Sequence, residues 1–466
     1  MKFLLHFPLL KGNIGSKQKQ TMSQKVTILV FSSLFVFLLT TISYSLLSYD
    51  SLWKINEFTG LSNDYGLKNN ETQSLQNETE SLKNQTCFRN ETESLKNLRD
   101  RLRDEAEKRA SKALEKCEIF SGEWVPNPEA PYYTNTTCWE IHEHQNCMKY
   151  GRPDSEFMKW RWKPNECELP IFNPFQFLEI MRGKSMAFVG DSIGRNHMQS
   201  MICLLSRAEW PIDVSYTDDF SFKRWQYSNY NFTMATFWSP YLVRAENVDS
   251  KGDLINIYLD EFDEKWTAEI KEFDYVIING GQWFLRPIVF YEKKKIVGCQ
   301  YCPRENVTHL TWHSGYRKAF RTAYKAIINL GNSKVVTILR TYAPSHFENG
   351  VWDKGGNCIR TTPFKSSETR LEGYNLELHT IQVQEFKRAE KKGVKRGLKF
   401  MLLDTTQAML LRPDGHPNNY GHSPHQNLTN DCVHWCLPGP IDTLADFLLE
   451  TLRREGLSSV PKKDFI

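Results

Sequence analysis

Two short motifs, far apart in the chain, carry residue types that can perform nucleophilic chemistry. The first, Gly190-Asp191-Ser192, follows the apolar run 186–189 and precedes apolar residues at helical spacing. This context predicts a tight strand-to-helix turn, with the Ser192 hydroxyl at a helix N-terminus where backbone N–H groups stabilise negative charge. The second motif, Asp431-Cys432-Val433-His434, sets a carboxylate three residues before an imidazole. If the segment is helical, the Asp431 and His434 side chains lie on one face of the helix, and Asp431 can orient the imidazole. Together with Ser192 they supply the nucleophile, the base and the orienting acid of an acyl-transfer site.

Neither motif is specific by itself, because such short patterns also occur in ordinary turns. Their context favours chemistry: a strand precedes Ser192, an amphipathic helix follows it, and His434 lies near the end of an alternating pattern of strands and helices. Residues 190–194 also fit the nucleophile elbow of α/β-hydrolases, in which the acid and the histidine come from separate loops. The three-residue spacing of Asp431 and His434 instead favours the arrangement of GDSL/SGNH-type esterases.

A further candidate is Asn279, which follows the apolar run 274–278 and precedes Gly280 and Gly281. An amide at a strand end can act as a second oxyanion donor beside the Ser192 N–H, and glycines let backbone approach a ligand closely. The alternative interpretation is an ordinary turn asparagine.

The elements that must position these residues alternate along the chain. Apolar strand candidates recur at 185–189, 254–259, 274–278, 334–340 and 399–404, and helical patterns cover 193–206, 314–330 and 374–395. A last helix is expected to begin near Asp442 as N-cap and to direct Leu444, Phe447, Leu448 and Leu452 inward. The alternation predicts an α/β fold, a three-layer sandwich with a mostly parallel sheet, in which ligands bind at the carboxyl ends of the strands.

The N-terminal region indicates a membrane anchor. Residues 26–47 form an uncharged apolar run that is long enough for one transmembrane helix. Only lysines precede it among charged residues, so residues 1–25 are expected to form a cytosolic tail. We favour an uncleaved signal anchor over a signal peptide, because no small-residue cleavage site follows. Residues 48–116 are polar and partly repeated and are expected to form a glycosylated lumenal stem, with a weak coiled coil over 98–116 as an alternative.

Glycan acceptors and cysteines agree with a lumenal location. N-x-S/T sites occur at Asn70, Asn77, Asn84, Asn90, Asn135, Asn231, Asn306 and Asn427. Eleven cysteines in such a chain indicate disulfides. Cys87 lies alone in the stem, either free or joined to a second chain. Cys299 and Cys302 have zinc-like spacing, but a local disulfide is favoured, and no metal site is expected.

The composition of residues 117–466 indicates two parts and argues against nucleic acid as a partner. Residues 117–184 contain four cysteines and read as a small disulfide-stapled N-terminal lobe, and residues 185–466 as the catalytic domain. The net charge is +4, of which residues 1–49 contribute +5, so the rest has no basic field for nucleic acid. The aromatic fraction, 13%, is mild support for carbohydrate binding, because most of these residues will be core.

Four longer runs together resemble the plant trichome birefringence-like family of Golgi type II membrane polysaccharide O-acetyltransferases. They are residues 117–125, 160–164, 187–197 and 431–439, and the similarity covers essentially everything after the stem. The resemblance implies an SGNH-like fold with Ser192 as nucleophile, His434 as base and Asp431 as orienting acid. It makes residues 117–170 an N-terminal domain that completes the substrate groove. It also implies the bridges Cys117–Cys167, Cys138–Cys203, Cys147–Cys436 and Cys358–Cys432.

The chain departs from the family pattern in two places. The family usually reads Asn-Thr-Gly-His-Trp-Trp where residues 279–284 read Asn-Gly-Gly-Gln-Trp-Phe, so Asn279 carries over and the histidine does not. The Cys299–Cys302 pair also falls outside that pattern.

The resemblance implies transfer of acetyl, through an acetyl-serine, to hydroxyls of a hemicellulose in the Golgi lumen. Xyloglucan is the favoured acceptor, with xylan or mannan as alternatives. No bound cofactor is expected, but an acetyl donor is required, either acetyl-CoA or a membrane-delivered carrier, and an acetyl-donor membrane protein is a candidate partner. Substrate-binding candidates, each with a structural ion pair or a core role as the alternative, are Arg195, Asn196, Arg340, Trp160, Arg161 and Trp162. A secretory-pathway carbohydrate acetylesterase and a non-catalytic wall-polymer binding protein are the competing functions.

Overall fold

The computed structural model describes residues 117–459, except residues 220, 249–253, 303–305, 332–333 and 427. The expected tail, signal anchor and stem, with Cys87, Asn70, Asn77, Asn84 and Asn90, lie outside the described residues, as does Asn427. Within the described part, no helix is long and apolar enough to cross a bilayer.

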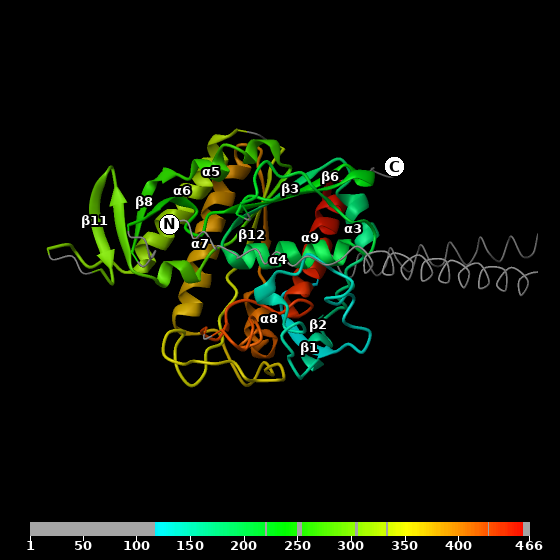
Figure 1. Ribbon diagram of the computed structural model, residues 1–466. Coiled ribbons are helices and arrows are strands. Elements are labelled where there is room, and N and C mark those ends of the chain that lie inside the picture. The colour runs from blue at the N-terminus through cyan, green and yellow to red at the C-terminus, as the bar shows by residue number, and fades with distance from the viewer. Residues whose placement is uncertain are drawn as a thin grey trace, which may run out of the picture. The chain divides into compact units, whose positions relative to one another are not determined.

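A seven-stranded sheet occupies the centre of the described region (Figure 1), in the order β13-β12-β9-β3-β6-β5-β4. The strands from β13 to β6 run parallel to one another, while β5 and β4 add an antiparallel edge. The bounds in that order are Lys399–Leu403, Val336–Arg340, Tyr275–Ile278, Ser185–Gly190, Phe232–Trp238, Arg224–Tyr227 and Ile212–Asp213. The prediction of an α/β fold with a mostly parallel sheet is therefore confirmed.

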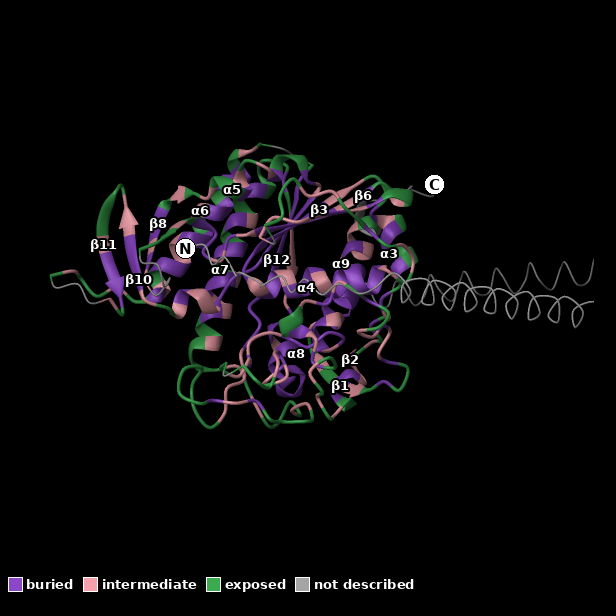
Figure 2. Cartoon of the chain, in the orientation of Figure 1, coloured by how far each residue is buried: buried purple, intermediate pink, exposed green. Residues whose placement is uncertain are grey.

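Helices cover both faces of this sheet. Met186 and Phe188 of β3 enter the core formed with α3 (Pro174–Ile180), α4 (Ser192–Leu205) and α9 (Thr443–Ser459). Ala187 and Val189 enter the core formed with α6 (Trp312–Asn329) and α7 (Gly373–Val394). Successive side chains of a strand point to opposite faces, so this alternation produces three layers. Figure 2 shows the buried residues along the central strands and on the helix sides that face them.

One strand assignment differs from the sequence-based expectation. The predicted strand 254–259 exists as β8 (Ile255–Phe262), but it belongs to a second sheet of order β11-β10-β8-β7. The other strands of that sheet are β7 (Val243–Asn247), β10 (Ile288–Glu292) and β11 (Lys295–Gln300). The place beside β3 is taken by β6, whose threonines at 233 and 236 obscure its apolar pattern. An apolar run indicates a strand, but it does not indicate which strand pairs with it.

The small N-terminal lobe is built on an antiparallel pair, β1 (Gly122–Pro126) and β2 (Trp160–Pro164). All four disulfides implied by the family resemblance are present, and Cys299–Cys302 is a local disulfide, as favoured. Two of them tie the lobe to the rest of the domain: Cys138–Cys203 to α4, and Cys147–Cys436 to the segment that follows His434. The lobe is therefore fixed relative to both candidate motifs.

The short helices α5 (Glu264–Thr267) and α8 (Thr406–Leu410) complete the described α-helices.

The last helix follows Asp442, and Leu444, Phe447, Leu448 and Leu452 are buried as predicted. Asp442 stands directly before α9, as expected, but the hydrogen bonds of its carboxylate are made to groups outside the first turn of that helix. It accepts hydrogen bonds from the Tyr133 hydroxyl (2.7 Å), the Ser200 hydroxyl (2.5 Å) and the Gly439 N–H (3.0 Å). Asp442 thus links the lobe, through Tyr133, to α4 and to the start of α9.

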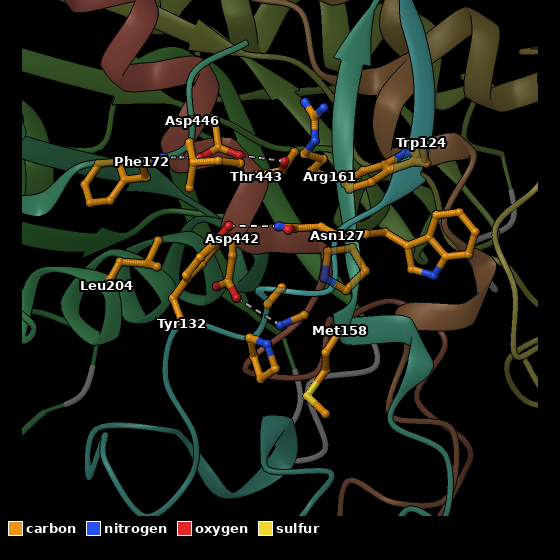
Figure 3. Close-up of a pocket in the computed structure, with 16 residues that line it drawn as sticks. Trp124, Asn127, Tyr132, Met158, Arg161, Phe172, Leu204, Asp442, Thr443 and Asp446 are labelled. Carbon is orange, nitrogen blue, oxygen red and sulfur yellow. Dashed lines mark hydrogen bonds between the residues drawn. The ribbon is translucent and has the colours of Figure 1, made fainter. Parts of the chain in front are cut away.

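Asp442 and Asp446 line a small cavity, about 30 Å³, between the lobe and α9 (Figure 3). Asp446 accepts hydrogen bonds from the Phe172 N–H (2.7 Å) and the Thr443 hydroxyl (3.0 Å). Burial raises the pKa of Asp442 to about 6 and that of Asp446 to about 7, and the neighbouring Asp442 carboxylate adds to the shift of Asp446. The pair is therefore a source of pH-dependent stability.

Replacing Asp446 with asparagine should flatten the dependence of stability on pH. The folded-state pKa lies above the unfolded value near 3.9, so the carboxyl contributes stability that is complete below that value and is lost as pH rises through about 7. Between pH 5 and 8 the wild-type free energy of unfolding should fall by roughly 2–4 kcal/mol more than that of Asp446→Asn. Thermal or urea unfolding across this range measures the difference. The exposed Glu166→Gln is the matched control, and parallel profiles for wild type and Asp446→Asn would contradict the prediction.

Candidate active site

Ser192, His434 and Asp431 form a continuous hydrogen-bonded chain. The Ser192 hydroxyl lies 2.7 Å from His434 Nε2, and His434 Nδ1 lies 2.7 Å from Asp431 Oδ2. With Nδ1–H donating to the carboxylate, Nε2 is free to accept the serine proton. All three side chains are partly exposed, so a substrate can reach them. This is the relative geometry that a nucleophile, its base and an orienting acid require.

Asp431 and His434 meet through a turn, and the expectation of a helical segment is wrong. Asp431 Oδ1 accepts hydrogen bonds from the backbone N–H groups of Val433 (3.0 Å) and His434 (2.9 Å). The carboxylate therefore shapes the turn with one oxygen and orients the imidazole with the other. Short polar side chains commonly form such local turns. On each flank a disulfide, through Cys432 or Cys436, fixes the segment.

The electrostatics of the pair favour a charged acid and a basic imidazole. Burial alone would lower the pKa of His434, but the Asp431 carboxylate and its hydrogen bond raise that pKa above the ordinary value. Burial alone would raise the pKa of Asp431, but His434 and the backbone N–H donors hold it well below its usual range. Asp431 is therefore ionised near neutral pH, and its charge can stabilise a protonated His434 imidazole.

The strand-to-helix turn at Ser192 is as the sequence predicts. Asp191 is the N-cap of α4, and its carboxylate accepts hydrogen bonds from the Ile193 N–H (3.0 Å) and from Asn279 Nδ2 (2.6 Å). Gly190 has a φ of +151°, and a Cβ there would lie 2.1 Å from the Asn279 carbonyl oxygen. A Cβ at residue 194 would lie 2.3 Å from Asn279 Oδ1. Only glycine fits at both positions, because the Asn279 segment packs directly against the turn.

The predicted oxyanion donors differ in position. The Ser192 N–H is the first of α4 and donates to no group in the described part of the chain. Asn279 is 1% exposed, and its Nδ2 donates a hydrogen bond to the Asp191 carboxylate that caps α4. Gly281 faces protein, since a Cβ there would collide with the Tyr342 ring. Ser192 N–H is thus a free donor at the site, and an oxyanion role for Asn279 stays a prediction.

Asn196 is a positioning residue, and its predicted place in the substrate groove is wrong. It is fully buried, one turn along α4 from Ser192. Its Oδ1 accepts from the Trp435 N–H (2.8 Å) and its Nδ2 donates to the Trp435 carbonyl (3.3 Å). From the other side, His416 Nδ1 lies 2.6 Å from the His434 carbonyl, and the His416 ring stacks on Trp435. The backbone of the base is therefore held from two directions.

Replacing Asn196 with alanine should reduce both stability and turnover. Two hydrogen bonds to the Trp435 backbone would be lost in a buried site, which costs roughly 1–3 kcal/mol of stability. His434 would then be less well placed, so kcat should fall roughly tenfold or more while KM changes little. Calorimetry and steady-state kinetics measure the two effects. The exposed Asn229→Ala should alter neither, and an unchanged kcat in Asn196→Ala would contradict the positioning role.

Ser192 and His434 open into a cavity of about 410 Å³ between the lobe and the catalytic domain. The lobe contributes one wall and the catalytic domain contributes aromatic and basic side chains. The residues that line it are Glu140, His142, His144, Gln145, Ser192, Arg195, Met198, Gln199, Lys223, Trp225, Thr236, Trp238, Trp283, Asp431 and His434. Arg195 lies in this wall as predicted, with its guanidinium 4.5 Å from the centre of the Trp238 ring. The cavity therefore combines flat aromatic faces with hydrogen-bonding groups beside the nucleophile.

The remaining groove candidates do not line the cavity that contains Ser192. Trp160 and Arg161 line the separate cavity of Figure 3, and Arg161 pairs with Glu168 at 2.7 Å. Trp162 is 1% exposed and donates to the Ile119 carbonyl. Arg340 is 2% exposed, burial lowers its pKa to about 10, and it donates to the Thr341 carbonyl. Arg161 thus takes part in an ion pair, and Trp162 and Arg340 are core residues, which are the structural roles given as alternatives for these candidates.

Sequence reasoning missed most of the cavity wall. His142 and His144 come from the lobe and Trp225, Trp238 and Trp283 from the catalytic domain, and only tertiary packing brings them to Ser192. The high aromatic content was the single signal that pointed toward them. Within the described ranges, no group of three or more His, Cys, Asp or Glu is placed to hold a metal ion. Of the acceptor asparagines, Asn231 and Asn306 are exposed and Asn135 is partly exposed.

The chain matches two family models. Residues 169–451 match PC-Esterase, the GDSL/SGNH-like acyl-esterase family found in Pmr5 and Cas1p, and residues 115–168 match the PMR5 N-terminal domain. Protein trichome birefringence-like 19 of Arabidopsis thaliana is 60% identical over 349 residues, which are 73% of this chain and 82% of the relative. Xyloglucan O-acetyltransferase 4 of Populus trichocarpa is 43% identical over 348 residues, 74% of this chain and 82% of the relative. Xyloglucan O-acetyltransferase 2 of Arabidopsis thaliana is 39% identical over 345 residues, with 73% and 83% covered.

Proposed function

Because the chain belongs to the PC-Esterase family, among the trichome birefringence-like proteins and xyloglucan O-acetyltransferases, we propose that it is a polysaccharide O-acetyltransferase. The acceptor is a hydroxyl of a plant cell-wall hemicellulose, with xyloglucan favoured over xylan or mannan. The observation that carries the proposal is the 2.7 Å contact between Ser192 Oγ and His434 Nε2 inside a cavity with aromatic walls. Relatives named xyloglucan O-acetyltransferase support the choice of acceptor.

The reaction has two halves that use the same three residues. In the first, Ser192 Oγ attacks the acetyl carbonyl of the donor while its proton passes to His434 Nε2, and Asp431 stabilises the imidazolium. The Ser192 N–H donates to the oxyanion, and the departing donor group takes the proton from His434. In the second half, His434 removes the proton of a sugar hydroxyl, whose oxygen attacks the acetyl-serine. The acetylated sugar leaves, and the proton returns to Ser192.

The competing function is an acetylesterase, in which water resolves the acetyl-serine. The same triad serves both reactions, so the outcome depends on whether the cavity holds a sugar hydroxyl and excludes water. Trp225, Trp238 and Trp283 give the cavity flat apolar faces of the kind that pack on sugar rings. This wall supports a carbohydrate ligand, which both reactions require, so dependence of product formation on the acceptor separates them.

We place the reaction in the Golgi lumen, with the chain as a type II membrane protein. The apolar run 26–47 follows a segment whose only charged residues are lysines. The acceptor asparagines Asn135, Asn231 and Asn306 are exposed or partly exposed, and both features support this placement. Five disulfides in the described region support an oxidising compartment. The acetyl donor is acetyl-CoA or a carrier delivered by a membrane protein.

The test is acetyl transfer by the purified full-length chain in detergent. It is incubated with an acetyl donor and with xyloglucan, xylan or mannan oligosaccharides, and mass spectrometry locates the added acetyl group. Transfer to one class that depends on acceptor concentration supports the proposal. Release of acetate at the same rate with and without acceptor would identify an esterase instead, and binding without either product would identify a polymer-binding protein.

A further inference from the structure

Two tryptophans outside the cavity present exposed faces to solvent. Trp139 is 60% exposed and Trp210 is 41% exposed, and their rings stack with centroids 5.7 Å apart and planes 23° from parallel. Trp139 comes from the N-terminal lobe, and Trp210 comes from the segment that follows α4. A single exposed aromatic side chain needs no explanation, but two large indoles held together at the surface form a built platform.

The platform continues into the cavity that contains Ser192. The Trp139 ring contacts Trp225 edge-on at 5.9 Å between centroids, and Trp225 is 5% exposed and lines the cavity wall. Glu140, the next residue after Trp139, lines the same wall. One row of indoles therefore leads from the wall of the candidate active site to the open surface.

A disulfide fixes the platform relative to the nucleophile. Cys138, the neighbour of Trp139, is bonded to Cys203 near the end of α4, and α4 begins at Ser192. A rise of 1.5 Å per residue separates residues 192 and 203 by roughly 16 Å along the helix axis. The disulfide that anchors Trp139 is therefore separated from Ser192, along α4, by the length of several sugar rings. A ligand that reaches both places must be an oligomer.

We propose that Trp139 and Trp210 form a distal acceptor subsite, which stacks a sugar ring of the polysaccharide several residues away from the ring that is acetylated. The assignment rests on the proposed function and adds the part of the substrate that binds beyond the cavity. Indole faces suit the apolar C–H face of a pyranose ring. Polar groups near the subsite come from the ion pair of Asp213 and Lys223, whose atoms lie 3.2 Å apart. Asp213 follows Trp210 closely in the sequence, and Lys223 lines the cavity.

The length dependence of the acceptor KM tests the subsite. For Trp139→Ala and Trp210→Ala, the KM for a long hemicellulose oligosaccharide should rise roughly tenfold, which matches the loss of one stacking contact. The KM for a fragment too short to span both places should rise less than twofold. Trp139→Tyr keeps a flat ring and should restore most of the affinity. Thermal unfolding verifies that the variants fold, and Trp139 is exposed enough for little effect on stability.

Trp352→Ala is the matched control, because Trp352 is 61% exposed on the loop 343–372 and does not line the cavity. Its KM should be unchanged for both acceptors. Equal KM values for wild type and Trp139→Ala with the long acceptor would overturn the subsite, as would an equal rise in Trp352→Ala. A change in the KM of the acetyl donor alone would assign the platform to the donor and would also overturn it. A wild-type chain that transfers no acetyl to any acceptor would instead refute the proposed function.

Discussion

Acetyl transfer should be abolished in Ser192→Ala, with a loss of roughly 10⁴-fold or more in kcat. In the proposed mechanism the serine oxygen carries the acetyl group between donor and acceptor, and no other hydroxyl is hydrogen-bonded to His434 in the described part of the chain. The change removes one partly exposed hydroxyl from a helix start, so folding and acceptor binding should persist. Transfer assays give the rate, and isothermal titration with an oligosaccharide gives the binding.

Mass spectrometry of the intact protein and of its peptides tests the same prediction directly. After brief exposure to a reactive acetyl ester, the wild type should carry one acetyl group on the peptide that contains Ser192, and Ser192→Ala should carry none. Ser206→Ala, at the other end of α4, is the matched control and should retain full transfer, because its hydroxyl only caps the Cys203 carbonyl. Full activity in Ser192→Ala would rule out the acetyl-serine route.

Local sequence was sufficient for residues whose partners are close in the chain. Gly190, Asp191 and Ser192 form the predicted turn because an apolar strand, a capping aspartate and an amphipathic helix follow one another directly. Asp431 and His434 pair as predicted, although a turn makes the pairing and a helix does not. A spacing of three residues brings two side chains together in either conformation, so the pattern predicted the contact without predicting the backbone.

Tertiary packing determines which residues line the cavity, and the sequence did not predict most of them. Trp160 and Arg161 lie in a conspicuous motif, but that motif packs the lobe against α9, away from Ser192. Trp225 and Trp238 line the cavity because β5 and β6 add to the edge of the sheet beside β3, and β6 was not recognised as a strand. Much of the wall of this site comes from loops and from β5 and β6, whose side chains are placed by contacts distant in sequence.

The lobe also explains why the site depends on parts of the chain that carry no catalytic group. Cys147–Cys436 joins the lobe to the His434 segment, and Cys138–Cys203 joins it to the helix that begins at Ser192. His142 and His144 enter the cavity from this lobe. The lobe therefore helps to hold His434 and Ser192 at hydrogen-bond distance while it forms one wall of the cavity.

The second large effect is expected in Asp431→Asn, with kcat reduced roughly 10³- to 10⁴-fold. Asparagine can still accept the Val433 and His434 N–H groups through Oδ1, so the turn should remain. Its Nδ2 cannot accept the Nδ1–H of His434, and it carries no charge to stabilise the imidazolium. The imidazole would then lose both its orientation and the stabilisation of its charged form, although the protein stays folded.

The pH profile distinguishes this mechanism from simple damage to the site. His434 acts as a base only when neutral, so wild-type activity should rise with pH through a pKa held above its ordinary value by Asp431. Without that carboxylate, burial lowers the pKa of His434, and the residual activity of Asp431→Asn should reach its plateau at a lower pH than in the wild type. Asp353→Asn, on an exposed loop, should keep both the rate and the profile. A reduced rate in Asp431→Asn with an unshifted profile would mean that Asp431 acts through structure alone, because the charge that raises the pKa of the base would then have to come from another group.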